Sequence, residues 1–414
     1  MKLTKEEKSW ILYDVANSAF ILIITATLPI YFRSMASSAG VVDNVITAWW
    51  GYATSISLIL LAFLAPVLGA IADYKGYKKK LFLGFLTLAL LAAISFTIVD
   101  TWQAFLFLYV LSRIGYSACN IFYDGMLIDV TTNERMDHVS SYGYAFGYIG
   151  STIPFIIGVA LIFFGDKIGL STLFATQLSF IITIAWWAIL SIPLLKNVKQ
   201  VHYLEHTNNV VRTSFKRVGQ TMKDIRKDKK LFFFILAYFF YIDGVYTIIS
   251  MATVYGGEVG IGAEMMLLAL LVTQFVAFPF AILSVKASKK WGILNVIKLC
   301  VLVYVFIAIF GFFLAHAWQF WTLAIVIGMA QGGVQSLSRS YFGQLIPKEK
   351  GNEYFGFFDI FGKFADFMGP MIIATSTLIF NESRYGVLML VLLFIVGLSL
   401  LGKVQKIENL ENQN

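Results

Sequence analysis

The sequence has few charged residues and few of the residue types that build catalytic or metal sites. Charged residues make up 14% of its 414 residues, against about 25% in a typical soluble domain. It contains 2 cysteines and 4 histidines, and no CxxC pair, HExxH segment or GxxxxGK(S/T) loop occurs. These absences exclude paired-cysteine zinc sites, zinc-protease chemistry and P-loop ATP hydrolysis. We therefore expect neither an enzyme nor a cofactor.

Long apolar stretches are what the sequence has in abundance. Hydrophobic residues make up 58% of the chain. Twelve stretches are each long enough to cross a bilayer, which takes about 20 residues per helix. They lie near residues 10–31, 49–72, 81–99, 102–129, 142–164, 171–195, 231–255, 265–285, 292–315, 318–341, 354–380 and 385–401. We predict an all-α membrane protein of twelve transmembrane helices in two six-helix bundles.

A polar segment divides the chain near its middle. We predict an N-terminal six-helix bundle over residues 1–195, a cytoplasmic linker over 196–230 and a C-terminal six-helix bundle over 231–414. In the linker, apolar residues recur at gaps of four and three among basic ones, which is typical of an amphipathic helix on a membrane surface. The helix either tethers the bundles or has a regulatory, lipid-sensing role. Its apolar residues are Val211, Phe215, Val218, Met222 and Ile225.

Basic residues are distributed by membrane side. The formal net charge is +8, yet the loops after the odd-numbered stretches contain no Lys or Arg other than Arg33, Lys167 and Arg384. The remaining loops and the linker hold most of the others. The positive-inside rule then places the linker and both termini in the cytoplasm. We therefore expect membrane lipid and a small-molecule substrate as partners, no nucleic acid, and a monomer.

The most specific short motif lies between the second and third stretches. It runs from Gly69 to Lys78 and reads GAIADYKGYK. A Gly such as Gly76 permits a tight reversal, and an Asp such as Asp73 can cap a helix or pair with a cation. The motif resembles the signature loop of the major facilitator superfamily, in which Asp and basic residues form a charge latch between spans. The resemblance implies a conformational latch that rests on Lys75 and Lys78, and its members are Gly69, Asp73, Lys75, Gly76 and Lys78.

Four further segments resemble one branch of that superfamily. They are 10–20 (WILYDVANSAF), 122–127 (FYDGML), 241–247 (YIDGVYT) and 331–340 (QGGVQSLSRS). Together they are similar to the vacuole effluxer-like family, whose eukaryotic members are linked to amino-acid release from vacuoles after autophagy. The resemblance implies a secondary active transporter that exports small solutes, with neutral amino acids as the leading candidates. The Lys- and Phe-rich composition favours a bacterial cytoplasmic membrane.

Polar residues inside the apolar stretches are the candidate substrate- and ion-binding residues, because each embedded charge costs at least about 2.5 kcal/mol. Arg113 lies near the middle of the fourth stretch and stays charged, so it must meet an anion. That anion belongs either to a substrate or to Asp14 or Asp366. The full candidate set is Asp14, Asn17, Arg113, Asp243, Tyr246, Gln274, Gln331, Gln335, Asp359, Lys363 and Asp366.

Two places in the second half offer a proton carrier. Asp359, Lys363 and Asp366 share one helix face at gaps of four and three, so Lys363 can pair with either acid and leave one carboxylate over. That carboxylate, or Asp243, is either a proton carrier or part of a structural hydrogen-bond set. Three functions stay open: an amino-acid exporter working by alternating access, with or without proton coupling, a multidrug or lipid exporter, and a non-transporting receptor or scaffold.

Overall fold

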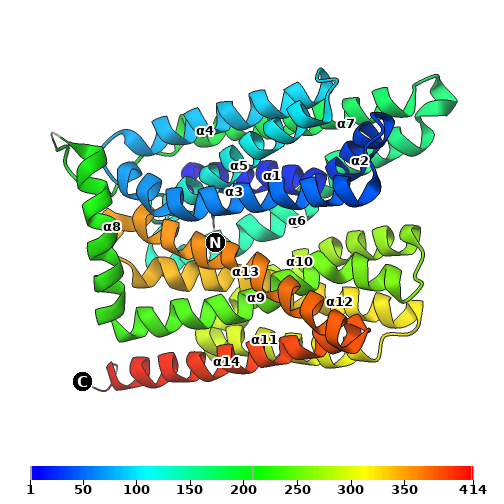
Figure 1. The fold of residues 1–414 in the computed structure, drawn as a ribbon. Coiled ribbons are helices and arrows are strands. Elements are labelled where there is room, and N and C mark those ends of the chain that lie inside the picture. The colour runs from blue at the N-terminus through cyan, green and yellow to red at the C-terminus, as the bar shows by residue number, and fades with distance from the viewer. Residues whose placement is uncertain (1, 208, 412, 414) are drawn as a thin grey trace. The chain divides into compact units, whose positions relative to one another are not determined.

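The computed structural model describes residues 2–207, 209–411 and 413. The side chains of residues 23, 24, 26, 43, 44, 47, 253, 254, 263, 264, 267, 363–367 and 374 lie outside this description. Every regular element in the described chain is a helix, apart from one isolated parallel β-bridge between Tyr74 and Leu204 (Figure 1). The all-α prediction is confirmed.

The helices follow the apolar stretches. In chain order they are α1 (Lys5–Ala26), α2 (Leu28–Ser38), α3 (Asp43–Ala72), α4 (Tyr77–Ile94), α5 (Trp102–Val130), α6 (Asn133–Phe164), α7 (Thr172–Asn197), α8 (Val210–Lys227), α9 (Lys229–Glu258), α10 (Ala263–Trp291), α11 (Ile293–Phe312), α12 (Ala317–Leu345), α13 (Gly351–Phe380) and α14 (Ser383–Glu411), with short 3₁₀ turns at η1 (Ser95–Thr97), η2 (Gly165–Ile168) and η3 (Lys348–Lys350).

Local capping explains where several helices begin. The Ser171 hydroxyl accepts the Phe174 N–H at 3.2 Å before α7, and the Asp228 carboxylate accepts the Leu231 N–H at 3.0 Å before α9. Such side chains satisfy N–H groups that have no partner within the helix. At Gly76 the backbone φ of 78° lets the chain reverse between α3 and α4.

Ten of the described helices are long and apolar enough to cross a membrane. They correspond to the second to tenth predicted stretches and to the twelfth. The first stretch is divided between α1 and α2, and the eleventh forms α13; both α1 and α13 include side chains outside the description. The count of twelve spans and the two six-helix bundles therefore stay predictions.

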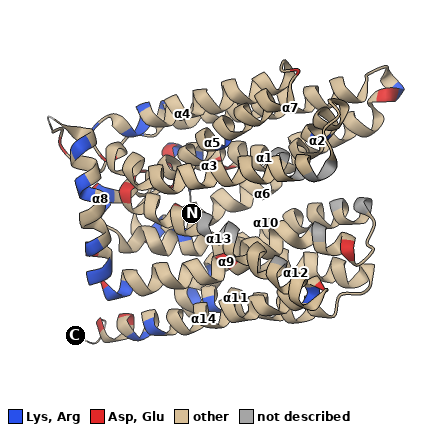
Figure 2. Ribbon diagram, in the orientation of Figure 1, with Lys and Arg blue, Asp and Glu red and all other residues tan. Residues whose placement is uncertain are grey.

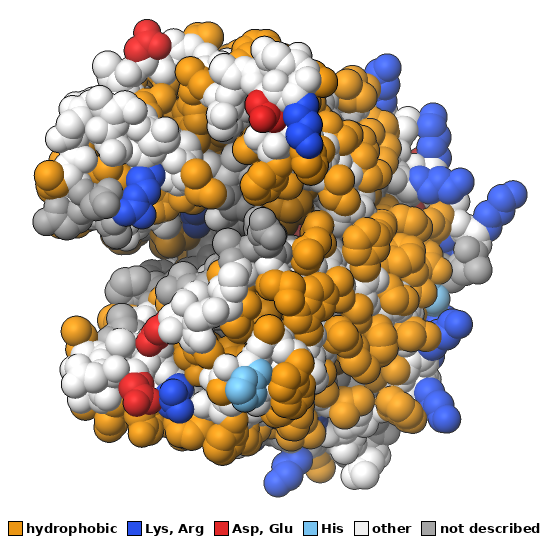
Figure 3. All heavy atoms as spheres, turned by 90° about the vertical axis from the view of Figure 1, so that its right-hand side faces the viewer, with side chains coloured by type: hydrophobic (Ala, Val, Ile, Leu, Met, Phe, Trp, Pro, Cys, Tyr) orange, Lys and Arg blue, Asp and Glu red, His pale blue; other side chains and the backbone are white. Residues whose placement is uncertain are grey.

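The outer surface is apolar. Phe63 is 77% exposed and Ile98 is 74% exposed, and hydrophobic side chains cover much of the face drawn in Figure 3. A soluble monomer rarely exposes large contiguous apolar patches. Lipid must therefore cover this surface, and the chain is an integral membrane protein.

The chain forms two compact units. Unit 1 comprises Met1–Thr131, Phe146–Ser214 and Lys348–Gly356, and unit 2 comprises Thr132–Ala145, Phe215–Pro347 and Phe357–Asn414. Helices α6 and α13 each begin in one unit and continue in the other. Each unit therefore contains the first turns of a helix whose remainder belongs to the other unit, while the predicted bundle limits remain a prediction.

Small residues allow close helix packing inside each unit. In unit 1, a Cβ added at Gly115 of α5 would lie 2.7 Å from the Phe85 carbonyl oxygen of α4. In unit 2, a Cβ added at Gly332 of α12 would lie 2.7 Å from the Ala281 Cβ of α10. Membrane helices associate largely by such close packing.

We expect Gly115→Ala to lower the thermal stability of the detergent-purified protein, since overpacking typically costs about 1–3 kcal/mol. The matched control is Gly84→Ala on α4, where an added Cβ meets nothing within 4 Å. Fluorescence-detected thermal unfolding compares the two variants with the wild type. Equal melting temperatures for Gly115→Ala and wild type would contradict the close α4–α5 packing.

Candidate functional site

A stripe of polar residues runs along α5 in unit 1. Between Ser112 and Ile128, all of which are described, the residues that keep partial exposure are Arg113, Tyr116, Asn120 and Asp124. Their gaps of three, four and four place them on one face of the helix. Polar side chains that stay accessible inside an apolar span are typical of a helix that lines a substrate path.

Arg113 supplies the positive charge of this stripe. Its Nη1 donates to the Tyr109 hydroxyl at 2.9 Å, and that hydroxyl lies 3.2 Å from Thr54 Oγ1 on α3. Within the described part of the chain, no carboxylate forms an ion pair with the guanidinium. Of the two carboxylates considered as alternatives to a substrate, Asp14 forms no ion pair with Arg113 in this structure, and the side chain of Asp366 lies outside the described residues.

The candidates on α1 adjoin the same stripe. Asp14 and Asn17 are both buried, and Asn17 Nδ2 donates to Asn120 Oδ1 at 2.9 Å. The structure thus joins the predicted residue Asn17 to Asn120, which was not among the predicted residues. The recurrence of polar residues along one face of α5 was the signal that would have found it.

Asp73 caps a helix that lies far away in the sequence. Its buried carboxylate accepts the backbone N–H and the side-chain amide of Asn352, both at 2.9 Å, and the Glu353 N–H at 3.1 Å. These groups form the first turn of α13, where unpartnered N–H groups and the positive end of the helix dipole favour an anion. Gly69 makes the contact possible, since a Cβ there would lie 2.2 Å from the Asn352 carbonyl oxygen.

The basic residues of the motif have other partners. Lys78 is 1% exposed, forms a buried ion pair with Asp129 at the end of α5 and also donates to the Gly125 carbonyl at 3.2 Å. Lys75 is exposed, and its Nζ lies 4.8 Å from the centre of the Tyr203 ring. The Asp73 carboxylate is thus bonded to the backbone amides of Asn352 and Glu353 and to the Asn352 side chain, and neither Lys75 nor Lys78 pairs with it. The sequence analysis did not identify Asn352 or Glu353, because they lie almost three hundred residues away.

Unit 2 has a related arrangement at the start of α6. Ser288 stands four residues after Ser284, as Asp73 stands four after Gly69, and its hydroxyl donates to Asp137 of α6 at 3.4 Å. Gln344 Nε2 on α12 donates to the same carboxylate at 2.9 Å. In unit 2 the acidic residue, Asp137, is on α6, whereas in unit 1 the acidic residue, Asp73, is in the loop after α3.

Arg339 holds the same part of α6 from within α12. It is buried, donates to the Ser140 hydroxyl and carbonyl at 3.0 Å each, and lies 4.2 Å from the centre of the Tyr144 ring. The sequence analysis quoted Arg339 within a family segment but assigned it no role.

Asp243 contacts the backbone of α13 in unit 2. The side chain is fully buried, and its Oδ1 accepts the Gly369 N–H at 2.9 Å. A Cβ at Gly369 would lie 1.7 Å from Thr247 Oγ1, so the two helices meet closely there. The next residue is Pro370, which has no N–H and weakens the helix at this point.

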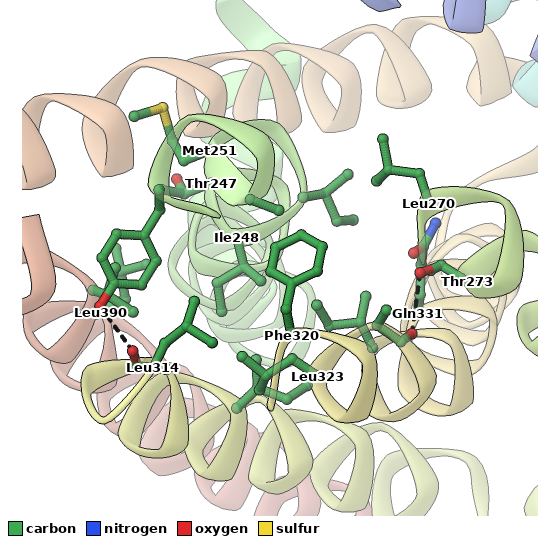
Figure 4. A pocket seen from close by; sticks show the side chains of 18 of the residues that line it. Thr247, Ile248, Met251, Leu270, Thr273, Leu314, Phe320, Leu323, Gln331 and Leu390 are labelled. Atoms are coloured by element: carbon green, nitrogen blue, oxygen red, sulfur yellow. Dashed lines mark hydrogen bonds between the residues drawn. The ribbon is translucent and has the colours of Figure 1, made fainter. Parts of the chain in front are cut away.

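A pocket lies among α9–α14 of unit 2 (Figure 4). Its volume is about 800 Å³, counting space open to the outside. Most of the lining is aliphatic or aromatic, such as Ile248, and the polar side chains include Thr247, Thr273, Gln274 and Gln331. This composition is usual for a small-molecule site with a few orienting polar groups.

For three of the remaining candidate residues, the structure gives the burial of the side chain. Gln335 is buried and does not line this pocket, while Tyr246 and Asp359 are partly buried. The side chains of Lys363 and Asp366 lie outside the described residues, so the expected triad on α13 stays a prediction.

The all-helical membrane fold of this chain is that of the major facilitator transporters. The human organic anion transporter MFSD10 (TETRAN) matches with a TM-score of 0.73 and 13% identity, covering 96% of this chain and 99% of that one. FucP in the outward conformation matches with a TM-score of 0.71 and 13% identity, covering 97% of each chain. At such identities the likeness shows the fold.

The chain belongs to the vacuole effluxer Atg22-like family, whose match covers residues 45–134 and 128–413. It is 45% identical over 408 residues to the uncharacterized MFS-type transporter YxiO of Bacillus subtilis, covering 97% of this chain and 95% of YxiO. It is 27% identical to autophagy-related protein 22 of Yarrowia lipolytica, over 63% of this chain and 49% of that protein. The chain thus spans about half the length of this fungal relative. The family predicted from the sequence motifs is confirmed.

We expect Asp73→Ala to expose the first amides of α13. Loss of an N-terminal cap costs about 1 kcal/mol, which corresponds to roughly fivefold faster hydrogen exchange. Exchange measured by mass spectrometry on a peptide over residues 349–357 tests this, with Lys75→Ala in the same loop as the control. Unchanged exchange in Asp73→Ala would refute the capping role.

Proposed function

We propose that the protein is a secondary active transporter that exports small neutral amino acids from a bacterial cell by alternating access. The observation that carries this proposal is the guanidinium of Arg113. It is partly buried in a membrane-spanning helix and has no carboxylate partner among the described residues. Because arginine stays charged, an anion must offset its burial, and a substrate carboxylate supplies that anion.

The rest of the α5 stripe suits the ammonium end of the same molecule. Tyr116 and Asn120 lie about 4.5 Å and 10 Å from Arg113 along the helix axis, at 1.5 Å per residue. Their oxygen atoms, and the carboxylate of Asp124 one turn further, can accept hydrogen bonds from an ammonium group. A guanidinium and several acceptors on one face favour a zwitterion over a bare anion.

Two further observations support a neutral solute and its export. The pocket of unit 2 is lined mainly by apolar residues, with Gln274 and Gln331 as neutral hydrogen-bonding groups. Such a lining favours an uncharged side chain over a charged one. The family is described as vacuole effluxers, which supports movement out of the compartment that holds the substrate.

The latch and the proton step complete the proposal. The Asp73 bonds to α13 would form in one state of the transport cycle and break in another. Asp243 would carry the coupling proton. Its buried carboxylate is bonded to Gly369 beside Pro370, so a change in its protonation could be coupled to a bend of α13 at the proline. Asp359 and Asp366, both on α13, are the alternative proton carriers.

The second candidate is export of drugs or lipids. The apolar lining of the unit 2 pocket favours it. An apolar substrate has no carboxylate, so its transport would not depend on Arg113.

We expect Arg113→Gln to weaken amino-acid counterflow in proteoliposomes by about 10- to 100-fold in apparent affinity, the usual effect of losing a hydrogen bond to a charged group. Arg113→Lys should retain part of the activity, because it keeps the charge but loses the forked geometry. The matched control is Arg384→Gln, at an exposed residue paired with Glu382. Wild-type counterflow by Arg113→Gln would exclude the carboxylate role. The second candidate would be favoured if the wild type transported no amino acid and transported drugs at a rate that Arg113→Gln leaves unchanged.

We expect Asp243→Asn to keep counterflow but to lose accumulation driven by a pH gradient, since an amide can still accept the Gly369 N–H but does not carry a proton. Uptake is measured with and without a gradient, and Asp100→Asn at an exposed loop residue is the control. Gradient-driven accumulation at the wild-type level in Asp243→Asn would move the proton step to another carboxylate.

A further inference from the structure

The first part of the linker is bound to the signature loop of unit 1. We call residues 198–206 the strap. Leu204 of the strap donates to the Asp73 carbonyl at 2.8 Å and accepts the Lys75 N–H at 3.0 Å, which produces the β-bridge with Tyr74. Asp73 therefore bonds to the strap through its backbone and to the start of α13 through its carboxylate.

Gln200 adds a second attachment. Its Nε2 donates to the carbonyls of Ala72 and Tyr74 at 3.1 and 3.2 Å, and its Oε1 accepts the Gly76 N–H at 3.0 Å. One side-chain amide thus satisfies the Ala72 carbonyl at the C-terminal end of α3, which lacks a helical partner. It also fixes the turn at Gly76.

A buried ion pair provides the third attachment. Asp129 Oδ2 pairs with Lys78, while Asp129 Oδ1 accepts the N–H groups of Val201 and His202 at 2.9 and 2.8 Å. The strap therefore shares one carboxylate with the signature loop. Displacing the strap would leave this carboxylate short of two hydrogen bonds, which buried charges tolerate poorly.

Helix α8 follows the strap and has two different faces. Val210, Ser214, Thr221 and Ile225 are buried. Val211 and Phe215 are 56% and 61% exposed, so the predicted apolar set is divided between the two faces. Basic residues occur along the whole helix (Figure 2), with Asp224 as the acidic one, and they are Arg212, Lys216, Arg217, Lys223, Arg226 and Lys227.

We propose that α8 docks on the anionic headgroups of the lipid bilayer and that the strap transmits this docking to the Asp73 cap of α13. Phe215 and Val211 would insert at the boundary of the acyl chains, and Arg212 and Lys216 beside them would bind the headgroups. Charge complementarity commits the surface to anionic lipid. The link runs from α8 through Leu204 to Asp73. This inference concerns regulation and does not depend on the identity of the substrate.

The test is hydrogen exchange of the full chain in nanodiscs, without substrate. Discs of zwitterionic phosphatidylcholine are compared with discs that also contain phosphatidylglycerol. We expect exchange at residues 200–204 and 351–356 to be at least fivefold slower in the anionic discs. Arg212→Gln/Lys216→Gln should abolish this difference, because each basic residue near an anionic surface contributes about fivefold. The matched control, Lys289→Gln/Lys290→Gln at exposed residues of α10, should retain it.

Gln200→Ala separates docking from transmission. We expect the lipid effect on α8 to remain in this variant while the effect on residues 351–356 is lost. Equal exchange in the two disc types, or a lipid effect that survives in Arg212→Gln/Lys216→Gln, would overturn the docking. Protection of the strap without any change at 351–356 in wild type would overturn the link to α13. Because no outcome depends on transport, the failure of this inference is distinguishable from failure of the proposed function.

Discussion

The carboxylate of Asp73 is the group on which the arrangement of the signature loop and the start of α13 in unit 1 depends. It accepts three hydrogen bonds from the first turn of α13, and its own carbonyl accepts one from the strap. The first amides of a helix need acceptors, and an anion also benefits from the helix dipole. A single buried residue thus fixes a helix start through its carboxylate and the linker through its backbone carbonyl. The close approach requires Gly69, where a Cβ would collide with Asn352.

Unit 2 reaches a similar end with different groups. There Arg339 of α12 donates to Ser140 near the start of α6, and Asp137 of α6 accepts from Gln344 of α12. In unit 1 the corresponding contact joins Asp73 to the first amides of α13. The two units also hold different chemistry within the membrane. Unit 1 has the half-buried charge of Arg113 on a polar stripe, while unit 2 has a mainly apolar pocket beside the Asp243–Gly369 contact.

The basic residues of the chain that are buried or half-buried differ in the groups that they contact. Lys78 meets Asp129 in a buried pair, and Arg339 meets hydroxyl, carbonyl and aromatic groups. Arg113 is bonded to a phenol that carries no charge. This difference was not visible in the sequence, where Lys78 begins a run of three lysines and Arg113 and Arg339 each stand alone.

The sequence by itself determined the helical membrane class and most of the helix positions, because apolar length and periodicity are local properties that the bilayer requires. The family followed from the resemblance of four short segments. It also identified Asp73, Arg113 and Asp243 as residues in need of a partner. Their partners were decided by the tertiary structure alone. Asn352 meets Asp73, Asn120 meets Asn17, and Gly369 meets Asp243, each pair joined across more than a hundred residues. No local pattern encodes such contacts, since they depend on which helix faces approach closely enough for a carboxylate or an amide to reach the backbone of another helix.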